Sequence, residues 1–164
     1  MMNKKSALIN EMIKYYAGDV KRINHFIKVY SFAKTIGEME QLDDENQEIL
    51  EIAAIVHDIG IKVSEQKYNS SSGKYQQIEG PALAKDLLEK IGFIDSIISR
   101  VCYLVGHHHT YNVIDDMDFQ ILVEADFLIN INEDEMSQEV ICKIRDKYFK
   151  TNTGINYLKM LYLA

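Results

Sequence analysis

The sequence predicts an all-α fold, a single-domain bundle of about seven or eight helices over residues 1–164. Apolar residues recur at the 3.6-residue period of a helix along most of the chain. One proline and eight glycines are few for the many turns of an all-β protein, and no segment has a convincing strand pattern. A chain of 164 residues with 47% hydrophobic residues is long enough to bury a core of its own.

The first two helices are predicted at residues 6–16 and from Asp19 onward. Asp19 is suited to cap the second helix, because its side chain can accept a hydrogen bond from a backbone N–H of the first turn. This helix carries two apolar stripes, and His25 lies in one of them. A histidine there is either a core residue bonded to a nearby carbonyl or a metal ligand.

The most apolar stretch, residues 51–60, is predicted to be a fully buried helix that starts at Asp43 or Asp44 and ends at Gly60. Asp58 would then face the negative end of the helix dipole, and its burial would need a cation. A metal ion held by both His57 and Asp58 would supply one if the helix loosened there. Alternatively, His57 bonds to the backbone and Asp58 pairs with a Lys or Arg.

Residues 62–77 are polar and are expected to form a long loop, either a mobile flap over the site or a solvated linker. The next helix is predicted to open at Glu79-Gly80-Pro81, with Pro81 in its first turn. Another helix, residues 94–107, leads into three consecutive histidines, His107 to His109, of which at most two can converge on one point.

The following helix carries a carboxylate, Asp126, on its apolar stripe, which is difficult to explain as solvated surface. Asp118 is expected to cap this helix. Glu124, one face over, and the acidic residues 133–135 are expected to be solvated. Two further helices, about 138–149 and 154–163, are predicted to complete the core.

Composition narrows the class of partner. A net charge of −7 and a pI near 5.2 argue against binding a nucleic-acid duplex, while a small phosphorylated ligand needs only a local group of Lys and Arg. No apolar stretch approaches the ~20 residues that span a bilayer, and residues 1–10 lack the apolar segment of a signal peptide. Cys102 and Cys142 lack metal or redox spacing and are expected to be reduced core residues of a cytoplasmic protein.

Four polar residues stand out together, because each lies on an apolar face and three separate helices supply them. They are His25, His57, Asp58 and Asp126. Such a nitrogen and oxygen donor set without thiolate suits Mn, Fe, Ni, Co, Zn or Mg better than a structural zinc site.

Their order resembles the HD superfamily of metal-dependent phosphohydrolases, in which a His is followed by His-Asp at a helix end and then by a distant Asp. Here the pattern reads Arg22-Ile23-Asn24-His25, then Ala53 to Gly60, then Val123-Glu124-Ala125-Asp126. The resemblance covers roughly residues 19–130, so it implies an HD-type core there, with C-terminal helices at 137–163 packed on it. It also implies an all-α fold and one divalent ion held by the four residues.

Some members of that family hold a second ion through a His before Gly-Pro or Gly-Ala and through a later His-His pair. This chain has Glu79 in place of the first His, and His107-His108 at the pair. Asp58 would bridge the two ions. The Lys that follows His-Asp-Ile-Gly in some branches is displaced here, since Ile61 precedes Lys62.

The resemblance therefore implies hydrolysis of a phosphate ester or anhydride of a small molecule, a nucleotide being favoured, by a metal-activated water. Asp58, Arg22 and Lys62 are the predicted catalytic residues, and Arg22, Lys62 and Lys74 are candidates to bind phosphate. The alternatives are an HD module that binds a ligand or serves as a scaffold without efficient catalysis, and a purely structural bundle. Oligomeric state, metal identity and the exact substrate stay open.

Overall fold

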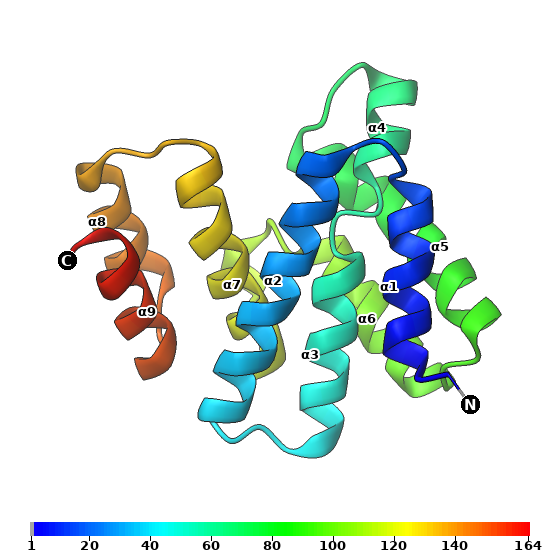
Figure 1. The fold of residues 1–164 in the computed structure, drawn as a ribbon, viewed down its shortest axis with the longest axis horizontal. Helices are drawn as coiled ribbons and strands as arrows, with labels where there is room; N and C mark the ends of the chain where they lie inside the picture. The colour runs from blue at the N-terminus through cyan, green and yellow to red at the C-terminus, as the bar shows by residue number, and fades with distance from the viewer. Residues whose placement is uncertain (1) are drawn as a thin grey trace.

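The computed structural model describes residues 2–164 and confirms the all-α class (Figure 1). Within these residues it has no strand, nine α-helices and one short 3-10 helix. The helices are α1 Lys4–Tyr15, α2 Val20–Met39, α3 Asp44–Val56, α4 Ile61–Tyr68, α5 Gly73–Ile91, α6 Asp95–His107, α7 Met117–Glu133, α8 Gln138–Tyr148 and α9 Asn152–Tyr162, with η1 at Tyr111–Val113.

Helix α3 lies at the centre of the bundle. Residues 49–56 are all buried, and all of them except Glu51 are apolar. The helix packs against α1, α2, α6 and α7, and Figure 1 shows α1 and α2 on either side of it. Its C-terminal end, where His57 and Asp58 follow, is therefore surrounded by other helices.

Side chains of the connecting segments define most helix starts. Asp19 accepts a hydrogen bond from the Arg22 N–H and Asp43 from the Asn46 N–H, so both predicted caps are confirmed. The cap of α7 is Asp116 instead of the predicted Asp118. Asp118 is buried, and its carboxylate accepts two hydrogen bonds from the guanidinium of Arg100 on α6.

The prediction of a long loop at residues 62–77 is wrong, since α4 and the first turns of α5 occupy most of it. Only residues 69–72 connect the two helices. Small residues allow this polar segment to pack closely: a Cβ on Gly60 would lie 2.6 Å from the Gln76 carbonyl oxygen, and one on Gly80 would lie 2.7 Å from Val105 Cγ1. Close backbone packing, which apolar periodicity does not reveal, holds the segment in place.

Pro81 accordingly lies inside α5 instead of opening a helix. A proline within a helix removes one backbone hydrogen bond and makes its ring crowd the preceding turn. The ring faces Gly106 of α6, where a Cβ would approach Pro81 Cγ to 3.1 Å. The absence of a side chain at Gly106 leaves room for the proline.

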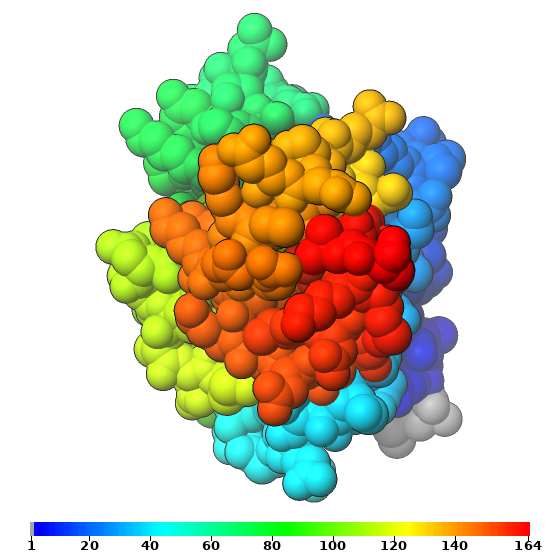
Figure 2. Space-filling model, turned by 90° about the vertical axis from the view of Figure 1, so that its left-hand side faces the viewer, coloured from blue at the N-terminus to red at the C-terminus, as the bar shows by residue number. Residues whose placement is uncertain are grey.

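Helices α8 and α9 cover one end of the molecule, the face toward the viewer in Figure 2. Glu124 of α7, expected to be solvated, is fully buried beneath them. Its carboxylate accepts hydrogen bonds from the Thr151 hydroxyl, the backbone N–H groups of Lys150 and Thr151, and the Gln120 amide. Four donors compensate for its burial, which is why a carboxylate can lie there.

None of the helices in residues 2–164 has the length and apolar character needed to cross a bilayer.

Candidate metal centre

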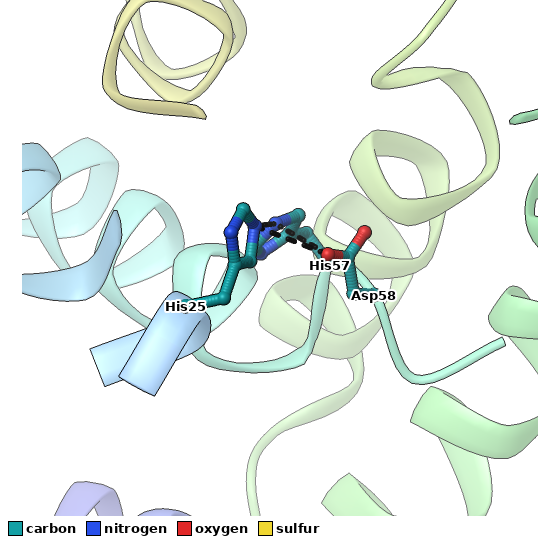
Figure 3. A group of neighbouring side chains, drawn as sticks. All are labelled: His25, His57 and Asp58. Atoms are coloured by element: carbon teal, nitrogen blue, oxygen red, sulfur yellow. Dashed lines mark hydrogen bonds and ion pairs between the residues drawn. The ribbon is translucent and has the colours of Figure 1, made fainter. Parts of the chain in front are cut away.

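The His57-Asp58 pair lies in a turn between α3 and α4. Helix α3 ends at Val56, and the Ile59 N–H then bonds to the Val56 carbonyl and the Ile61 N–H to the Asp58 carbonyl, each at 3.0 Å. These short-range bonds release the two side chains from the 100° spacing of a regular helix. The loosening predicted for this point is present, and Figure 3 shows both side chains directed toward His25 of α2.

Two tyrosines at the end of α1 hold this turn from behind. The Tyr16 hydroxyl donates to the Asp58 carbonyl at 2.6 Å, and the Tyr15 hydroxyl donates to the Ile59 carbonyl at 3.2 Å. The predicted role of Gly60 changes, because it is the first residue before α4 with φ −76°, an ordinary helical value. Because Gly60 has no side chain, α5 can pack closely against it. Contrary to the prediction from the sequence, Gly60 does not terminate a helix.

The four residues singled out in the sequence converge. His25 Nε2 lies 3.2 Å from His57 Nε2, 3.2 Å from Asp58 Oδ2 and 3.1 Å from Asp126 Oδ1. His57 Nε2 lies 3.3 Å from the same oxygen of each aspartate. Helix α2, the turn after α3, and α7 supply them, so two imidazole nitrogens and two carboxylates meet at one point.

In both rings the other nitrogen faces an acceptor. His57 Nδ1 lies 2.7 Å from the Ala54 carbonyl oxygen, and His25 Nδ1 lies 3.0 and 3.1 Å from the two carboxylate oxygens of Glu133. Carbonyls and carboxylates need a donor, so each Nδ1 carries a proton. Nε2 is then the nitrogen of each ring that can present a lone pair to the centre of the cluster when a cation takes the place of its proton.

The two carboxylates of the cluster need positive charge beside them. Burial lowers the pKa of His25, but the hydrogen bonds that its ring donates to the carboxylates of Asp126 and Asp58 more than offset this and raise that pKa to about 11. Burial opposes a similar rise at His57, where the charge of Asp58 and the hydrogen bond of Asp126 bring the pKa to about 10. Although burial raises the pKa of Asp58 and Asp126, the surrounding histidines hold both below their usual range. Protons or a divalent cation can meet this demand.

A second group of possible ligands shares Asp58 and adds His108 and His109. His108 Nδ1 lies 2.8 Å from the Val105 carbonyl oxygen, and its Nε2 lies 3.4 Å from Asp58 Oδ1. That Nε2 is buried and has no hydrogen-bond partner among residues 2–164, which is unusual for a buried polar atom. Asp58 thus faces the first group with Oδ2 and the second with Oδ1, and both groups fit divalent ions.

Residues 22–147 match the family described as "HD domain". The chain belongs to the HD domain family. The fold is similar to a crystal structure described as a predicted HD superfamily hydrolase from an uncultured Thermotogales bacterium, with a TM-score of 0.71 and 22% identity. That similarity covers 96% of this chain and 84% of the other. No curated protein matches this chain.

Two residues predicted as second ligands in this HD domain lie elsewhere. The Glu79 carboxylate accepts hydrogen bonds from Lys67 and from the Tyr68 hydroxyl on α4. His107 donates to the Tyr103 carbonyl and stacks on the Tyr103 ring. Neither belongs to the two groups that can hold a metal within residues 2–164. Glu79 lies well inside α5, which directs its side chain away from the metal centre. His107 is still part of α6, and its side chain also points away from the metal centre.

His109, which the sequence left unassigned, joins the second group. Its Nε2 lies 3.0 Å from the Gln76 side-chain oxygen, so Nδ1 is the nitrogen left with a lone pair. Burial and the neighbouring His108 lower the pKa of His109 to about 4, so the ring is neutral. Gly73 gives the ring its space, because a Cβ there would lie 2.8 Å from it.

A polar cavity of about 310 Å³ opens onto the first group. It is lined by Lys21, Arg22, His25, Asp58, Ile61, Ser71, Gln76, His109, Asp126, Asn130, Glu133 and Asp134. Arg22 is in this wall, as predicted, and is held by Asp19 at 3.3 Å and by an ion pair with Glu65. Lys21 adds a second cation that the sequence did not single out.

The two other predicted cations lie outside this wall. Lys62 donates to the Tyr15 carbonyl at 3.1 Å, with its ammonium over the Tyr15 ring, and Lys74 lies over the Tyr75 ring. Lys62 follows the His-Asp turn on the exposed side of α4, so the extra residue Ile61 occupies the position nearer the site. The structure therefore leaves Lys21 and Arg22 as the cations that face the cavity.

Proposed function

We propose that the chain is a metal-dependent phosphohydrolase that cleaves an ester or anhydride bond of a small phosphorylated molecule, and that this molecule is a nucleotide. One observation carries the proposal. The Nε2 atoms of His25 and His57 lie within 3.3 Å of carboxylate oxygens of Asp58 and Asp126, while the Nδ1 atoms are already bound to acceptors. Such preset lone pairs beside carboxylates are what a divalent cation requires.

The ligands divide into two sets that share Asp58. His25, His57, Asp58 and Asp126 would hold one ion, and Asp58, His108 and His109 would hold a second. When bound, a divalent cation supplies an acidic water for attack on phosphorus and neutralises phosphoryl charge. Two ions favour a phosphodiester or anhydride substrate, since attacking and leaving oxygens are both stabilised, whereas one ion suits a phosphomonoester.

The cavity wall would bind the rest of the substrate. Arg22 and Lys21 present cationic donors near the ligand cluster, and a guanidinium can bind two phosphate oxygens at once. The pairing of Arg22 with Asp19 and Glu65 fixes its position at the wall before substrate arrives. A nucleotide is favoured because the order of His25, His57-Asp58 and Asp126 resembles that of small HD hydrolases, some of which act on nucleotides.

The purified protein loaded with Mn²⁺, Co²⁺ or Ni²⁺ tests this proposal. A generic phosphodiester, a phosphomonoester and a panel of nucleotides are the substrates. We expect turnover that requires the metal, and we expect Asp58→Ala to lose both bound metal and turnover, because Asp58 belongs to both ligand sets. Asp86→Asn, an exposed carboxylate on α5, is the matched control and should retain both.

The possible results separate the functional classes. Metal binding without turnover on any substrate, together with tight nucleotide binding, would favour a ligand-sensing module. Absence of metal after loading, measured by elemental analysis, would leave a structural bundle. Stoichiometric metal in Asp58→Ala would show that Asp58 is not a ligand.

A further inference from the structure

Glu133 lies on the same face of α7 as Asp126. The two are seven residues apart, almost two full turns, and Asn130 lies between them on the cavity wall. Acidic residues at this end of a helix face the negative pole of its dipole, and Asp134 and Glu135 add further negative charge. The position is therefore unfavourable for a carboxylate unless a nearby positive group compensates.

His25 is the only positive or potentially positive side chain within ion-pair distance of Glu133 in residues 2–164. Both carboxylate oxygens approach the same ring nitrogen, Nδ1, at 3.0 and 3.1 Å. The Glu133 side chain is 18% exposed and that of His25 is 9% exposed, so water competes little for this contact. The carboxylate closes the outer side of the His25 ring while Nε2 faces Asp58 and Asp126.

His25 needs such a partner because of its place in the chain. His57 and His108 follow helix ends, where backbone carbonyls are left without an intrahelical donor, and their rings bond to the carbonyls of Ala54 and Val105. His25 lies inside α2, where the backbone carbonyls already accept helical hydrogen bonds. Its Nδ1 is bonded to a carboxylate of another helix, α7, and not to a carbonyl of its own helix.

We infer that Glu133 is a positioning residue, which holds the His25 ring with Nδ1 protonated and Nε2 directed at the metal centre. This inference rests on the proposed function for the metal, but the contact with the ring does not. A carboxylate bonded to a ligating histidine fixes its orientation and makes the ligating nitrogen more basic, and losing such a partner costs about 10- to 100-fold in metal affinity.

Two variants of Glu133 test the inference by two measurements. Zn²⁺ and Mn²⁺ titrations give the Kd, and ¹H–¹⁵N spectra of histidine side chains, assigned with His25→Gln, follow the Nδ1–H proton of His25. We expect Glu133→Ala to weaken metal binding about 10- to 100-fold and to lose the protected Nδ1–H signal. Glu133→Gln keeps an acceptor but no charge, so it should keep the signal and lose less affinity.

Asp134→Asn is the matched control, because it removes a neighbouring charge from the same cavity wall without touching His25. It should leave the Nδ1–H signal unchanged and the Kd within about twofold. Circular dichroism melting of each variant separates a lost contact from a lost fold. If Glu133→Ala stayed folded but kept both the wild-type Kd and the signal, or if Glu133→Gln lost the signal, the inference would be overturned.

The proposed function can fail separately. A wild-type protein that binds neither Zn²⁺ nor Mn²⁺ would contradict the metal site, yet the spectra of the metal-free variants would still decide whether Glu133 holds the ring.

Discussion

At the end of α6, two adjacent histidines have opposite environments. The ring of His107 stacks on Tyr103 at a centroid distance of 4.2 Å and is half-buried against its own helix. The ring of His108 is buried against His57, with an unpartnered Nε2 near Asp58. A change of about 100° in direction between neighbours therefore separates a packing residue from a candidate ligand.

This difference predicts a different metal content for the two alanine variants. His108→Ala removes a nitrogen of the second group only, so it should lose one metal equivalent and keep the other. His107→Ala removes only the stacking contact and should keep both equivalents. Elemental analysis and anomalous scattering at the metal edge would measure this, with the neighbouring variants serving as each other's control. Loss of an equivalent in His107→Ala alone would restore the assignment made from the sequence.

Helix α7 serves two parts of the molecule at once. Asp126 faces the metal centre, while Glu124, two residues earlier, faces the connection between α8 and α9. Gly154 lies so close to Glu124 that a Cβ could not be accommodated without movement. The C-terminal pair of helices is thus attached through a buried polar contact in addition to apolar packing.

Glu124→Ala should destabilise the protein by about 3–5 kcal/mol, because it leaves several buried donors without an acceptor. Glu124→Gln should also destabilise it, since an amide places an NH₂ against groups that are themselves donors. Glu139→Ala on exposed α8 is the control and should leave the midpoint nearly unchanged. Denaturant unfolding measures all three. A wild-type midpoint for Glu124→Ala would mean that the network contributes little.

At the level of whole helices, the apolar periodicity of the sequence predicted a helix wherever the buried side chains are large. It predicted α3 because apolar residues lie on all sides of the helix over residues 49–56, with Glu51 as the one charged exception. It missed α4 and the first turns of α5, where the buried positions are Ser64, Gln76 and Gly80. Small and polar residues pack there because of close backbone approach, and a sequence pattern does not show which helix will come close.

Over the whole molecule, the four converging residues could be found because each is polar on an apolar face. Glu133 and His109 could not be assigned in the same way, since both lie at helix ends where polar residues are usually solvated. Their roles depend on which helix faces them, His25 of α2 for one and Gln76 of α5 for the other. The spacing of Asp126, Asn130 and Glu133 was the one signal in the sequence that could have indicated Glu133.

The whole molecule should also gain stability from its metal. Helix α7 and the turn after α3 bring the carboxylates of Asp58, Asp126 and Glu133 around His25 of α2, and these carboxylates repel one another without a cation. An ion that binds only the folded state, at about 100 times its Kd, adds about 2.7 kcal/mol to the free energy of unfolding.

For a chain of this size, that gain corresponds to a rise of roughly 5–10 °C in the Tm. Calorimetry of the protein with Mn²⁺ and with a chelator should show this rise. Asp126→Asn should show little of it, because it loses a ligand of the first group, while Asp86→Asn should match the wild type. Equal Tm values for the wild type with and without Mn²⁺ would mean that no ion binds to the folded state. Since the ligands come from α2, α7 and the turns after α3 and α6, bound metal should also raise the Tm as a single transition, instead of stabilising one helix alone.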